Sequence, residues 1–403
     1  MLPFRSRPAL TLADVYGPGL VNNPRPPFTT DRWLPSEPTV WDGRTGSSLS
    51  ILGGMPILCS AGLLTKSAIR MMELAGIEPT INAFTYDDRD TYETHVREIR
   101  SRGQRLVFHH YHPPTERAAA DYWIDPTLLA WLNDKASLDT LVPQACLPQR
   151  RLVRADDVSR LAACDDHWPL VLKGTGPAAS GGGYSVAIVA HPDDLPATLG
   201  KFAADEMVVV EEFVDIRANC CLNYATLDGR SVFLGGSEQV TDAAGGFHGN
   251  WLGPDAEPTP EMVAVGHEIL DLAIKRGYRG LAGFDMVLDA AGRVRVLDLN
   301  FRINFSTSAM AWMPTLRERH GDDIRGRNIR LELPQPASRW WPKVVDLVRA
   351  GSFFPLAVFT PDSETQPDHR AALHGIWLGR TRDETERKRW AFLQSIGVAT
   401  RAA

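Results

Sequence analysis

The feature that most constrains this chain is a pair of β-rich runs, FDMVLD and RVRVLDLN, on either side of a short turn that ends in Gly292. Together they predict an antiparallel hairpin. We place the centre of an even-numbered turn between Ala291 and Gly292. The strand register then sets Asp285 directly opposite Asp298, and Asn300, two residues further on, shares their face. Two facing carboxylates destabilise a bare hairpin, so this face is expected to bind a cation.

The ligand atoms on this face are all oxygens. Hard divalent ions prefer carboxylate and amide oxygens, so Asp285, Asp298 and Asn300 predict a Mg²⁺ site, with Mn²⁺ as the alternative. Water and phosphate oxygens would complete the coordination shell. Acidic residues on a solvated edge hairpin would give much the same pattern. The rest of the chain has to discriminate between these two interpretations.

The composition is that of a globular protein. Of 403 residues, 44% are hydrophobic and 23% are charged, which is ordinary for a chain long enough to form two or three domains. The formal net charge of -6 argues against nucleic acid as the main partner. No secretory signal and no apolar run of about 18 residues is visible, and the five cysteines lack zinc-type spacing. We therefore expect a cytoplasmic protein with reduced thiols and no membrane partner.

The first third of the chain changes character near residue 50. Residues 1–49 are rich in Pro and Gly and predict an extended arm that lies on the body of the protein. The segments SILGGMPILCSAG, LLTKSAIRMMELAGI, TYETHVREIRSRG and QRLVFHHYH then predict a small parallel α/β domain. The last of these contains His109, His110 and His112, for which an exposed loop is the commonest explanation. A substrate-facing role for one of them is favoured over a metal site, because strand ends in such sheets face ligand clefts.

The segment WPLVLKGTGPAASGGGYSVAIV predicts two strands around a loop of small residues, Ser180, Gly181, Gly182 and Gly183. Such a loop lets backbone N–H groups approach a phosphate chain closely. Lys173, at the end of the first strand, would add a positive charge for the same phosphates. A plain flexible hairpin loop is the alternative interpretation.

The apolar strand EMVVVEEFVD turns acidic at Glu211 and Glu212. Backbone groups after such a strand would contact an adenine edge, and a carboxylate would bind a ribose hydroxyl, as in dinucleotide sites. Both Glu212 and Asp215 are candidates for the ribose.

Two further segments bear on a binding site. Residues Ser237 to Gly253 are polar and glycine-rich and predict a long loop that serves as a lid or substrate loop. Lys135 lies near the middle of a predicted helix, DPTLLAWLNDKASLDTLVP, where a solvated helix face is the ordinary explanation of a lysine.

Taken in order, these segments resemble the ATP-grasp superfamily of carboxylate–amine ligases over roughly residues 50–310. The resemblance rests on NDK with Lys135, VLKGTGPAASGGGYSVAIV with Lys173, VVVEEFV, and GFDMVLDAAGRVRVLDLNFRINFST. It implies an α/β and α+β chain with the ATP-grasp fold. The expected parts are a preceding small α/β domain at 50–134, a small lid subdomain at 135–212, a core with the metal site at 213–325, and a C-terminal α/β or helical appendage at 326–403.

The resemblance also implies a role for each candidate residue. Lys135 and Lys173 would contact the ATP phosphates, and the glycine loop would cover them. The metal site would consist of Asp285, Asp298 and Asn300. The adenosine would lie against a run of five residues, Glu211, Glu212, Phe213, Val214 and Asp215.

The chain departs from the family pattern at two positions. Asp298 stands where the family usually has Glu, and Gly283 stands where some members have Arg. Arg302, which shares the strand parity of Asn300, is our candidate cation for the transferred phosphoryl group. The predicted catalytic set also contains Asn304 and His248, and the loop that carries His248 would shield an acyl phosphate from water.

The implied function is ATP- and Mg²⁺-dependent formation of an amide or peptide bond. A small-molecule carboxylate would be phosphorylated, an amino acid or peptide amine would attack the acyl phosphate, and ADP would be released. The alternatives are a carrier-protein thiol or a phosphoryl acceptor, and a catalytically impaired ATP-binding regulatory protein. The unusual terminal segments suggest specialised metabolism, and a homodimer would be a common oligomeric state.

Overall fold

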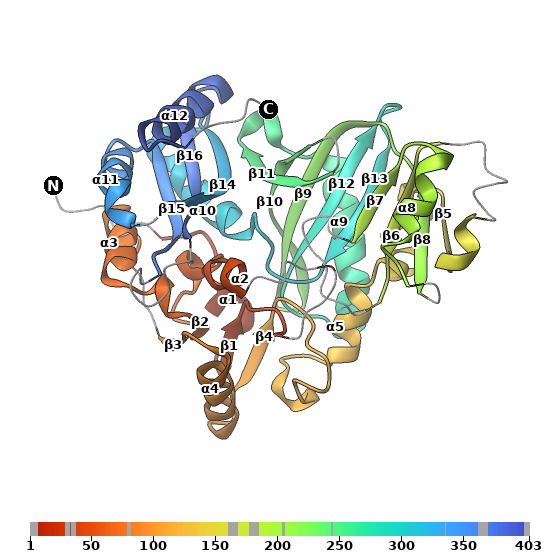
Figure 1. The fold of residues 1–403 in the computed structure, drawn as a ribbon, viewed down its shortest axis with the longest axis horizontal. Coiled ribbons are helices and arrows are strands. Elements are labelled where there is room, and N and C mark those ends of the chain that lie inside the picture. The colour runs from red at the N-terminus through yellow and green to blue at the C-terminus, as the bar shows by residue number, and fades with distance from the viewer. Residues whose placement is uncertain are drawn as a thin grey trace.

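The computed structural model describes residues 7–28, 33, 38–78, 82–159, 168–176, 185–203, 206–242, 245–334, 336–361 and 370–398. Within these ranges the named strands form three sheets. Figure 1 shows a large sheet in the middle of the molecule, a parallel sheet in red and orange below it, and a small yellow-green sheet at the right.

The N-terminal sheet is parallel and has the strand order β3-β2-β1-β4. Its strands are β1 (Leu20–Asn23), β2 (Ile57–Ser60), β3 (Ala83–Tyr86) and β4 (Arg105–Phe108). Part of the predicted N-terminal arm is therefore an inner strand, β1. Helices α1 (Leu12–Tyr16) and α2 (Pro38–Arg44) flank this strand in the sequence.

The two helices predicted in this domain are α3 (Lys66–Leu74) and α4 (Arg89–Ser101). Each begins at a residue whose side chain accepts a hydrogen bond from the first turn, Thr65 for α3 and Asp88 for α4. Such N-caps satisfy backbone N–H groups that have no partner within the helix. The local sequence thus determines where both helices start.

The large sheet is antiparallel and has the order β13-β12-β9-β10-β11-β14-β16-β15. Its strands are β9 (Ile216–Leu227), β10 (Arg230–Thr241), β11 (Phe247–Leu252), β12 (Leu281–Asp289), β13 (Val294–Asn300), β14 (Arg325–Leu333), β15 (Phe353–Phe359) and β16 (Ala371–Gly379). The accompanying helices are α9 (Pro260–Lys275), α10 (Thr307–His320), α11 (Trp341–Arg349) and α12 (Arg382–Ser395). The C-terminal segment continues this sheet because β14 pairs with β11.

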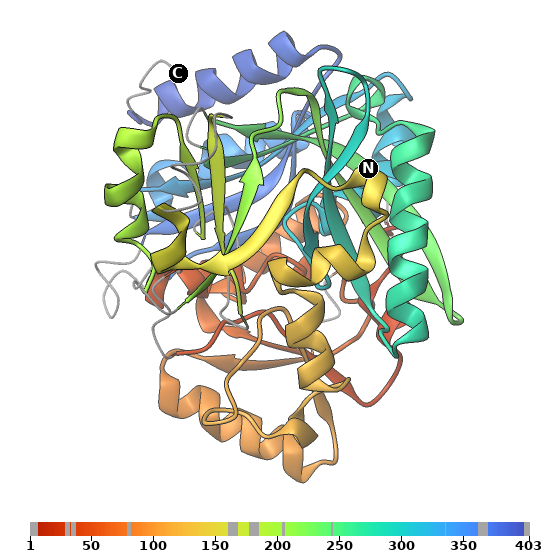
Figure 2. The same cartoon turned by 90° about the vertical axis from the view of Figure 1, so that its right-hand side faces the viewer.

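The small sheet is antiparallel, with the order β5-β8-β6-β7. Its elements are β5 (Arg150–Arg154), β6 (Leu170–Gly174), β7 (Val186–Val189), β8 (Met207–Glu212) and helix α8 (Leu195–Leu199). Figure 2 brings this side of the molecule toward the viewer. Buried residues such as Leu172, Val208 and Phe202 form a core under this sheet that is separate from the main one.

Two sequence predictions are corrected here. The helix expected around Lys135 is interrupted: α5 (Pro126–Leu132) ends before a 3₁₀ turn, Lys135–Ser137, which α6 (Leu138–Leu141) follows. The side chain of Asp134 accepts a hydrogen bond from the Ala136 N–H at 3.0 Å, and this local bond competes with a continuous helix.

The loop predicted from Ser237 to Gly253 is also wrong, because most of it lies in β10 and β11. One of its glycines, Gly249, serves close strand packing. A Cβ at Gly249 would lie 2.3 Å from the carbonyl oxygen of Asn328 on the neighbouring β14. Glycine in a strand often marks such a close backbone approach.

No helix in the described ranges has the length and apolar character needed to cross a membrane.

Candidate functional site

The β12–β13 hairpin sets Asp285 opposite Asp298, as predicted. The predicted turn is wrong, since it contains three residues: the Asp289 N–H donates to the Arg293 carbonyl at 2.9 Å. An odd turn alone would shift the two aspartates out of register by one residue. A β-bulge at Leu297 adds one residue to β13 and restores the pairing.

The two facing carboxylates differ in acidity. Burial and the charge of Asp298 raise the pKa of Asp285 to about 7. Burial also raises the pKa of Asp298, but the charges of Lys135, Lys173 and Arg302 outweigh it and lower that pKa below its ordinary value. The Gln239 amide donates to Asp285 Oδ1 at 2.7 Å. Asp285 is therefore a carboxyl group that an added cation would ionise.

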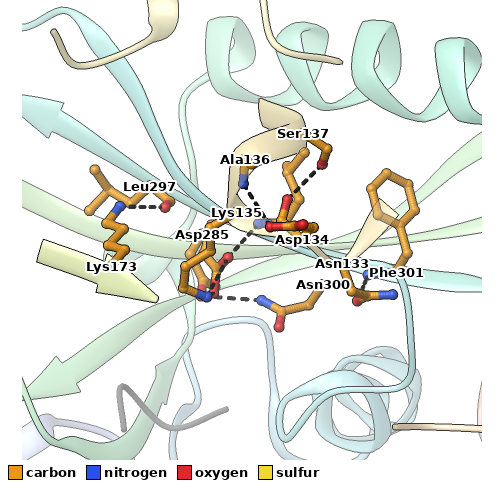
Figure 3. A network of polar contacts seen from close by, with 12 residues as sticks. Asn133, Asp134, Lys135, Ala136, Ser137, Lys173, Asp285, Leu297, Asn300 and Phe301 are labelled. Atoms are coloured by element: carbon orange, nitrogen blue, oxygen red, sulfur yellow. Dashed lines mark hydrogen bonds and ion pairs between the residues drawn. The ribbon is translucent and has the colours of Figure 1, made fainter. Parts of the chain in front are cut away.

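Two buried lysines meet β13 at adjacent residues. Lys135 Nζ donates to both carboxylate oxygens of Asp298, at 3.2 and 3.1 Å. Lys173 Nζ donates to the Leu297 carbonyl at 2.8 Å and forms an ion pair with Glu211. Figure 3 shows Lys173 at Leu297 and Lys135 beside Asp285. One lysine comes from the turn between α5 and α6, and the other comes from β6 of the small sheet.

Glu211 lies between two cations. Besides Lys173, it faces Arg150, whose Nη1 is 3.4 Å from Glu211 Oε1. Neither of these two buried atoms makes a hydrogen bond within the described residues. Arg150 also pairs with Asp139 at 3.2 Å and donates to the Lys135 carbonyl at 2.5 Å. Arg150 Nη1 and Glu211 Oε1 thus attract each other as an ion pair, while the hydrogen-bonding capacity of both is unused among the described residues.

The segment after Glu211 connects the small sheet to the large one. The carboxylate of Glu212 accepts the Gln149 N–H at 2.9 Å, and the Asp215 carbonyl accepts the Ala290 N–H at 3.0 Å. Phe213 is 42% exposed, and Val214 is partly buried. Four other candidates, Ser180, Gly181, Gly182 and Gly183, lie outside the described residues.

Arg302 faces the same acidic hairpin. Its Nη1 donates to Asn133 Oδ1 at 3.1 Å. Burial lowers the pKa of Arg302, and the charges of Asp298 and Asp285 partly offset this effect. The structure thus brings the predicted cation within electrostatic range of Asp285 and Asp298, the two carboxylates among the predicted metal ligands.

Asn304 mainly organises the start of helix α10. Its side-chain oxygen accepts the backbone N–H groups of Ser306 and Thr307, both at 3.0 Å. A Cβ at Gly283 would lie 1.6 Å from Asn304 Nδ2. The glycine therefore makes room for this side chain, which explains why the family's arginine has no place there.

His248 lies apart from these residues. It is exposed on β11, and its Nε2 is 2.9 Å from Asp242 Oδ2. Within the described residues, its side chain forms a hydrogen bond and an ion pair with Asp242 and none with the hairpin carboxylates. Its predicted catalytic role stays a prediction.

Sequence reasoning missed Arg150, Asn133 and Gln239. Arg150 stands in the basic run QRRLVR at the start of a strand. This run of positive charge was the sequence signal that could have identified Arg150 as a site residue. Asn133 and Gln239 reach the site only through the interrupted helix and through the part of β10 that replaces the predicted loop.

The residues of the hairpin fit a hard divalent ion. Within the described ranges, no three His, Cys, Asp or Glu side chains form a metal-binding group, and the hairpin combines two carboxylates with the amide of Asn300. Asn300 Nδ2 is 3.4 Å from Asp285 Oδ2. Two carboxylates and one amide supply the oxygens that Mg²⁺ uses.

Two family models match the chain. The model of the ATP-grasp domain of L-aspartate--L-methionine ligase matches residues 148–300, and the model of the N-terminal domain of that ligase matches residues 11–130. Together the two ranges cover more than half of the chain.

Solved structures share the fold over nearly the whole chain. An L-amino acid ligase from Bacillus licheniformis has 12% identity and a TM-score of 0.52, over 93% of this chain and 97% of that one. Phosphoribosylamine--glycine ligase from Thermotoga maritima has 14% identity and a TM-score of 0.54, over 93% and 96%. N5-carboxyaminoimidazole synthase from Aspergillus clavatus, solved with ADP, has 10% identity and a TM-score of 0.56, over 94% and 98%.

The mixed α/β architecture expected from the sequence is thus confirmed. The family implies the use of ATP and a divalent metal ion, with small-molecule carboxylate and amine substrates. The chain is a member of the ATP-grasp superfamily of carboxylate–amine ligases, and it forms an amide bond with release of ADP.

Proposed function

We propose that this chain uses ATP and Mg²⁺ to join L-aspartate and L-methionine through a peptide bond, with aspartate as the carboxylate that is phosphorylated. The substrates are those in the name of the matching family. One observation carries the assignment of the site: Lys135 and Lys173, from separate elements, reach β13 at the adjacent residues Asp298 and Leu297. Such a convergence of cations beside paired carboxylates suits a Mg²⁺-bound polyphosphate.

The proposed roles follow from the charges. Lys135 and Lys173 bind the ATP phosphates, and Asp285, Asp298 and Asn300 hold Mg²⁺. The ion, when bound, neutralises phosphate charge. Its positive charge also favours the ionised form of Asp285, whose pKa is raised to about 7 without it.

The nucleotide is proposed to lie between the small and large sheets. Residues 211–215 join β8 to β9 and offer backbone groups for the adenine, with Asp215 or Glu212 for the ribose. The small sheet has its own core, which suits a lid subdomain that moves as a unit. The loop of Ser180 to Gly183 is proposed to cover the phosphates.

The reaction needs positioning and charge neutralisation. An oxygen of the substrate carboxylate attacks the γ-phosphorus of ATP and ADP leaves. The methionine nitrogen then attacks the acyl carbon, phosphate leaves, and the nitrogen loses a proton. Arg302 faces the hairpin and is proposed to bind the transferred phosphoryl group. Asn304 orders the start of α10 beside it.

The test is ADP release from ATP by the purified protein with Mg²⁺, L-aspartate and L-methionine. We expect ADP only when both amino acids are present, and a product whose mass equals their sum less one water. Formation of AMP, or ADP release that does not require an amine, would contradict the proposal. Turnover with free methionine would also show that the reaction needs no carrier-protein acceptor. Size-exclusion chromatography would test the predicted homodimer.

A further inference from the structure

Two arginines from distant parts of the sequence lie near each other on the side of the large sheet that faces helix α2. Arg330 stands on β14, and Arg44 ends α2. The Nη2 atom of Arg330 donates to the Val40 carbonyl of α2 at 3.4 Å. A Cβ at Gly43 would lie 2.8 Å from the same nitrogen, so the guanidinium packs directly against this helix.

Two of the three side-chain nitrogens of Arg330 have no hydrogen-bond acceptor among the described residues. Its Nε and Nη1 atoms are buried and have no hydrogen-bond partner within the described residues. Arg44 lies over the Trp41 ring at 4.8 Å, and no described carboxylate forms an ion pair with either arginine. A buried guanidinium with unused donors is costly unless a ligand supplies the missing acceptors.

The local charge supports the same conclusion. Burial and the charge of Arg44 lower the pKa of Arg330 to about 10. The charge of Glu332 raises this pKa, but Glu332 is an exposed residue two positions along the strand. Burial, together with the charge of Arg330, lowers the pKa of His374 to about 3. The surroundings are thus positive and would stabilise an anion.

Two series of side-chain contacts connect this pair of arginines to the neighbourhood of the acidic hairpin. The His110 ring contacts Trp41 with centroids 5.8 Å apart, and the charges of both Arg302 and Arg44 act on His110. On the other side, His374, which pairs with Arg330 across β14 and β16, stacks on Phe305 at 4.5 Å.

Both series of contacts end at residues near the hairpin. Phe305 directly follows Asn304 in the chain, and Arg302 is the cation that faces the two aspartates. An anion at Arg44 and Arg330 would therefore lie close to the proposed reaction centre without occupying it.

We propose that Arg44 and Arg330 form a subsite that binds a substrate carboxylate that is not phosphorylated. Two guanidinium groups match the planar carboxylate through paired hydrogen bonds. This inference rests on the proposed function and names the residues that select for amino acids. The carboxylate has two sources, the second carboxylate of aspartate and the carboxylate of methionine.

The variants Arg330→Gln and Arg44→Gln test the subsite, with Arg339→Gln, an exposed arginine, as the matched control. In each Gln variant we expect the KM of one amino acid to rise about 10- to 100-fold, as for the loss of a charge-assisted hydrogen bond, with the KM of ATP unchanged. Arg330→Lys should recover part of the loss.

Substrate amides then identify the source. If the second aspartate carboxylate binds here, wild type should have a higher KM for asparagine than for aspartate. The Arg330→Gln variant should then have similar KM values for asparagine and aspartate. If the methionine carboxylate binds, methioninamide gives this result instead. The inference is overturned if both arginine variants leave the KM of both amino acids within twofold of wild type.

A binding measurement separates this inference from the proposed function. Thermal shifts are recorded with ATP, Mg²⁺ and each common amino acid in turn. We expect at least one amino acid to stabilise wild type and Arg339→Gln but not Arg330→Gln, even if aspartate and methionine prove to be the wrong pair. Equal stabilisation of all three proteins, or no stabilisation of wild type by any amino acid, would refute the subsite.

Discussion

Lys173 donates its hydrogen bond to Leu297, the residue that the β-bulge adds to β13. The bulge therefore does two things: it sets Asp285 opposite Asp298 in spite of an odd turn, and it presents a carbonyl to a lysine of the small sheet. This contact joins the small sheet to the hairpin of the large sheet. A phosphate bound at Lys173 would compete for the same ammonium group.

Replacement of Lys173 by Met should abolish turnover and destabilise the protein. Glu211, which is 2% exposed, would lose its closest cation. Removal of one partner of a buried ion pair costs about 3 kcal/mol or more. Urea denaturation and ADP release measure the two effects.

The double variant Lys173→Met/Glu211→Gln separates them. It should recover much of the lost stability, because no unpaired carboxylate remains, while ADP release stays absent. Recovery of activity together with stability would show that Lys173 is only a structural partner of Glu211.

Replacement of Asp285 or Asp298 by Asn should abolish ADP release at any practical Mg²⁺ concentration. Each change removes one of two carboxylates proposed to hold the ion. The matched control is Asp228→Asn in the turn between β9 and β10, where φ is 50° and Asn is well tolerated. Activity of Asp298→Asn equal to that of Asp228→Asn would refute the metal assignment.

The free energy of unfolding without metal should depend on pH through Asp285. Its folded pKa is raised to about 7, so between pH 4 and 7 the folded state binds more protons at this group than the unfolded state. The contribution therefore stabilises at low pH and is lost as pH rises, by at most about 1.4 kcal/mol per pH unit.

Comparison of wild type with Asp285→Asn in EDTA isolates this contribution, since other titrating groups are common to both proteins. Wild type should lose stability relative to the variant as pH rises from 5 to 7.5. Added Mg²⁺ should reverse the loss. A stability difference that is constant over this range would contradict the raised pKa.

Local signals were sufficient for the hairpin and for the helices of the N-terminal domain. The two strands follow from their β-rich sequences, although the facing of Asp285 and Asp298 was predicted through a turn of the wrong length, and α3 and α4 follow from their caps and apolar spacing. The ATP-grasp fold was identified from the order of weak motifs. The strands and helices depend on residues that are close together in the sequence, and the fold depends on the order of such local segments along the chain.

The missed features depend on tertiary contacts. Gly249 belongs to a strand because it is packed between neighbours, which no local pattern of a glycine-rich segment shows. Arg150 and Arg330 gain their importance from the acids and helices that surround them. The turn was assigned the wrong length because a bulge at Leu297 compensates for it, and single-strand patterns do not reveal a bulge.

Gly283→Ala should strongly impair the enzyme. The added Cβ would lie 1.6 Å from Asn304 Nδ2, so the Asn304 side chain has to leave and the Ser306 and Thr307 N–H groups at the start of α10 lose their acceptor. Loss of hydrogen bonds of this kind at a helix start costs about 1 kcal/mol, and the displaced segment lies two residues from Arg302, so we expect turnover to fall more than stability. Gly200→Ala is the control, because its nearest neighbours are at 3.4 and 3.8 Å and the site is exposed. The control should stay within about 0.5 kcal/mol of wild type. If Gly283→Ala matched it in both turnover and unfolding, the packing of Asn304 against β12 would have no part in building this site.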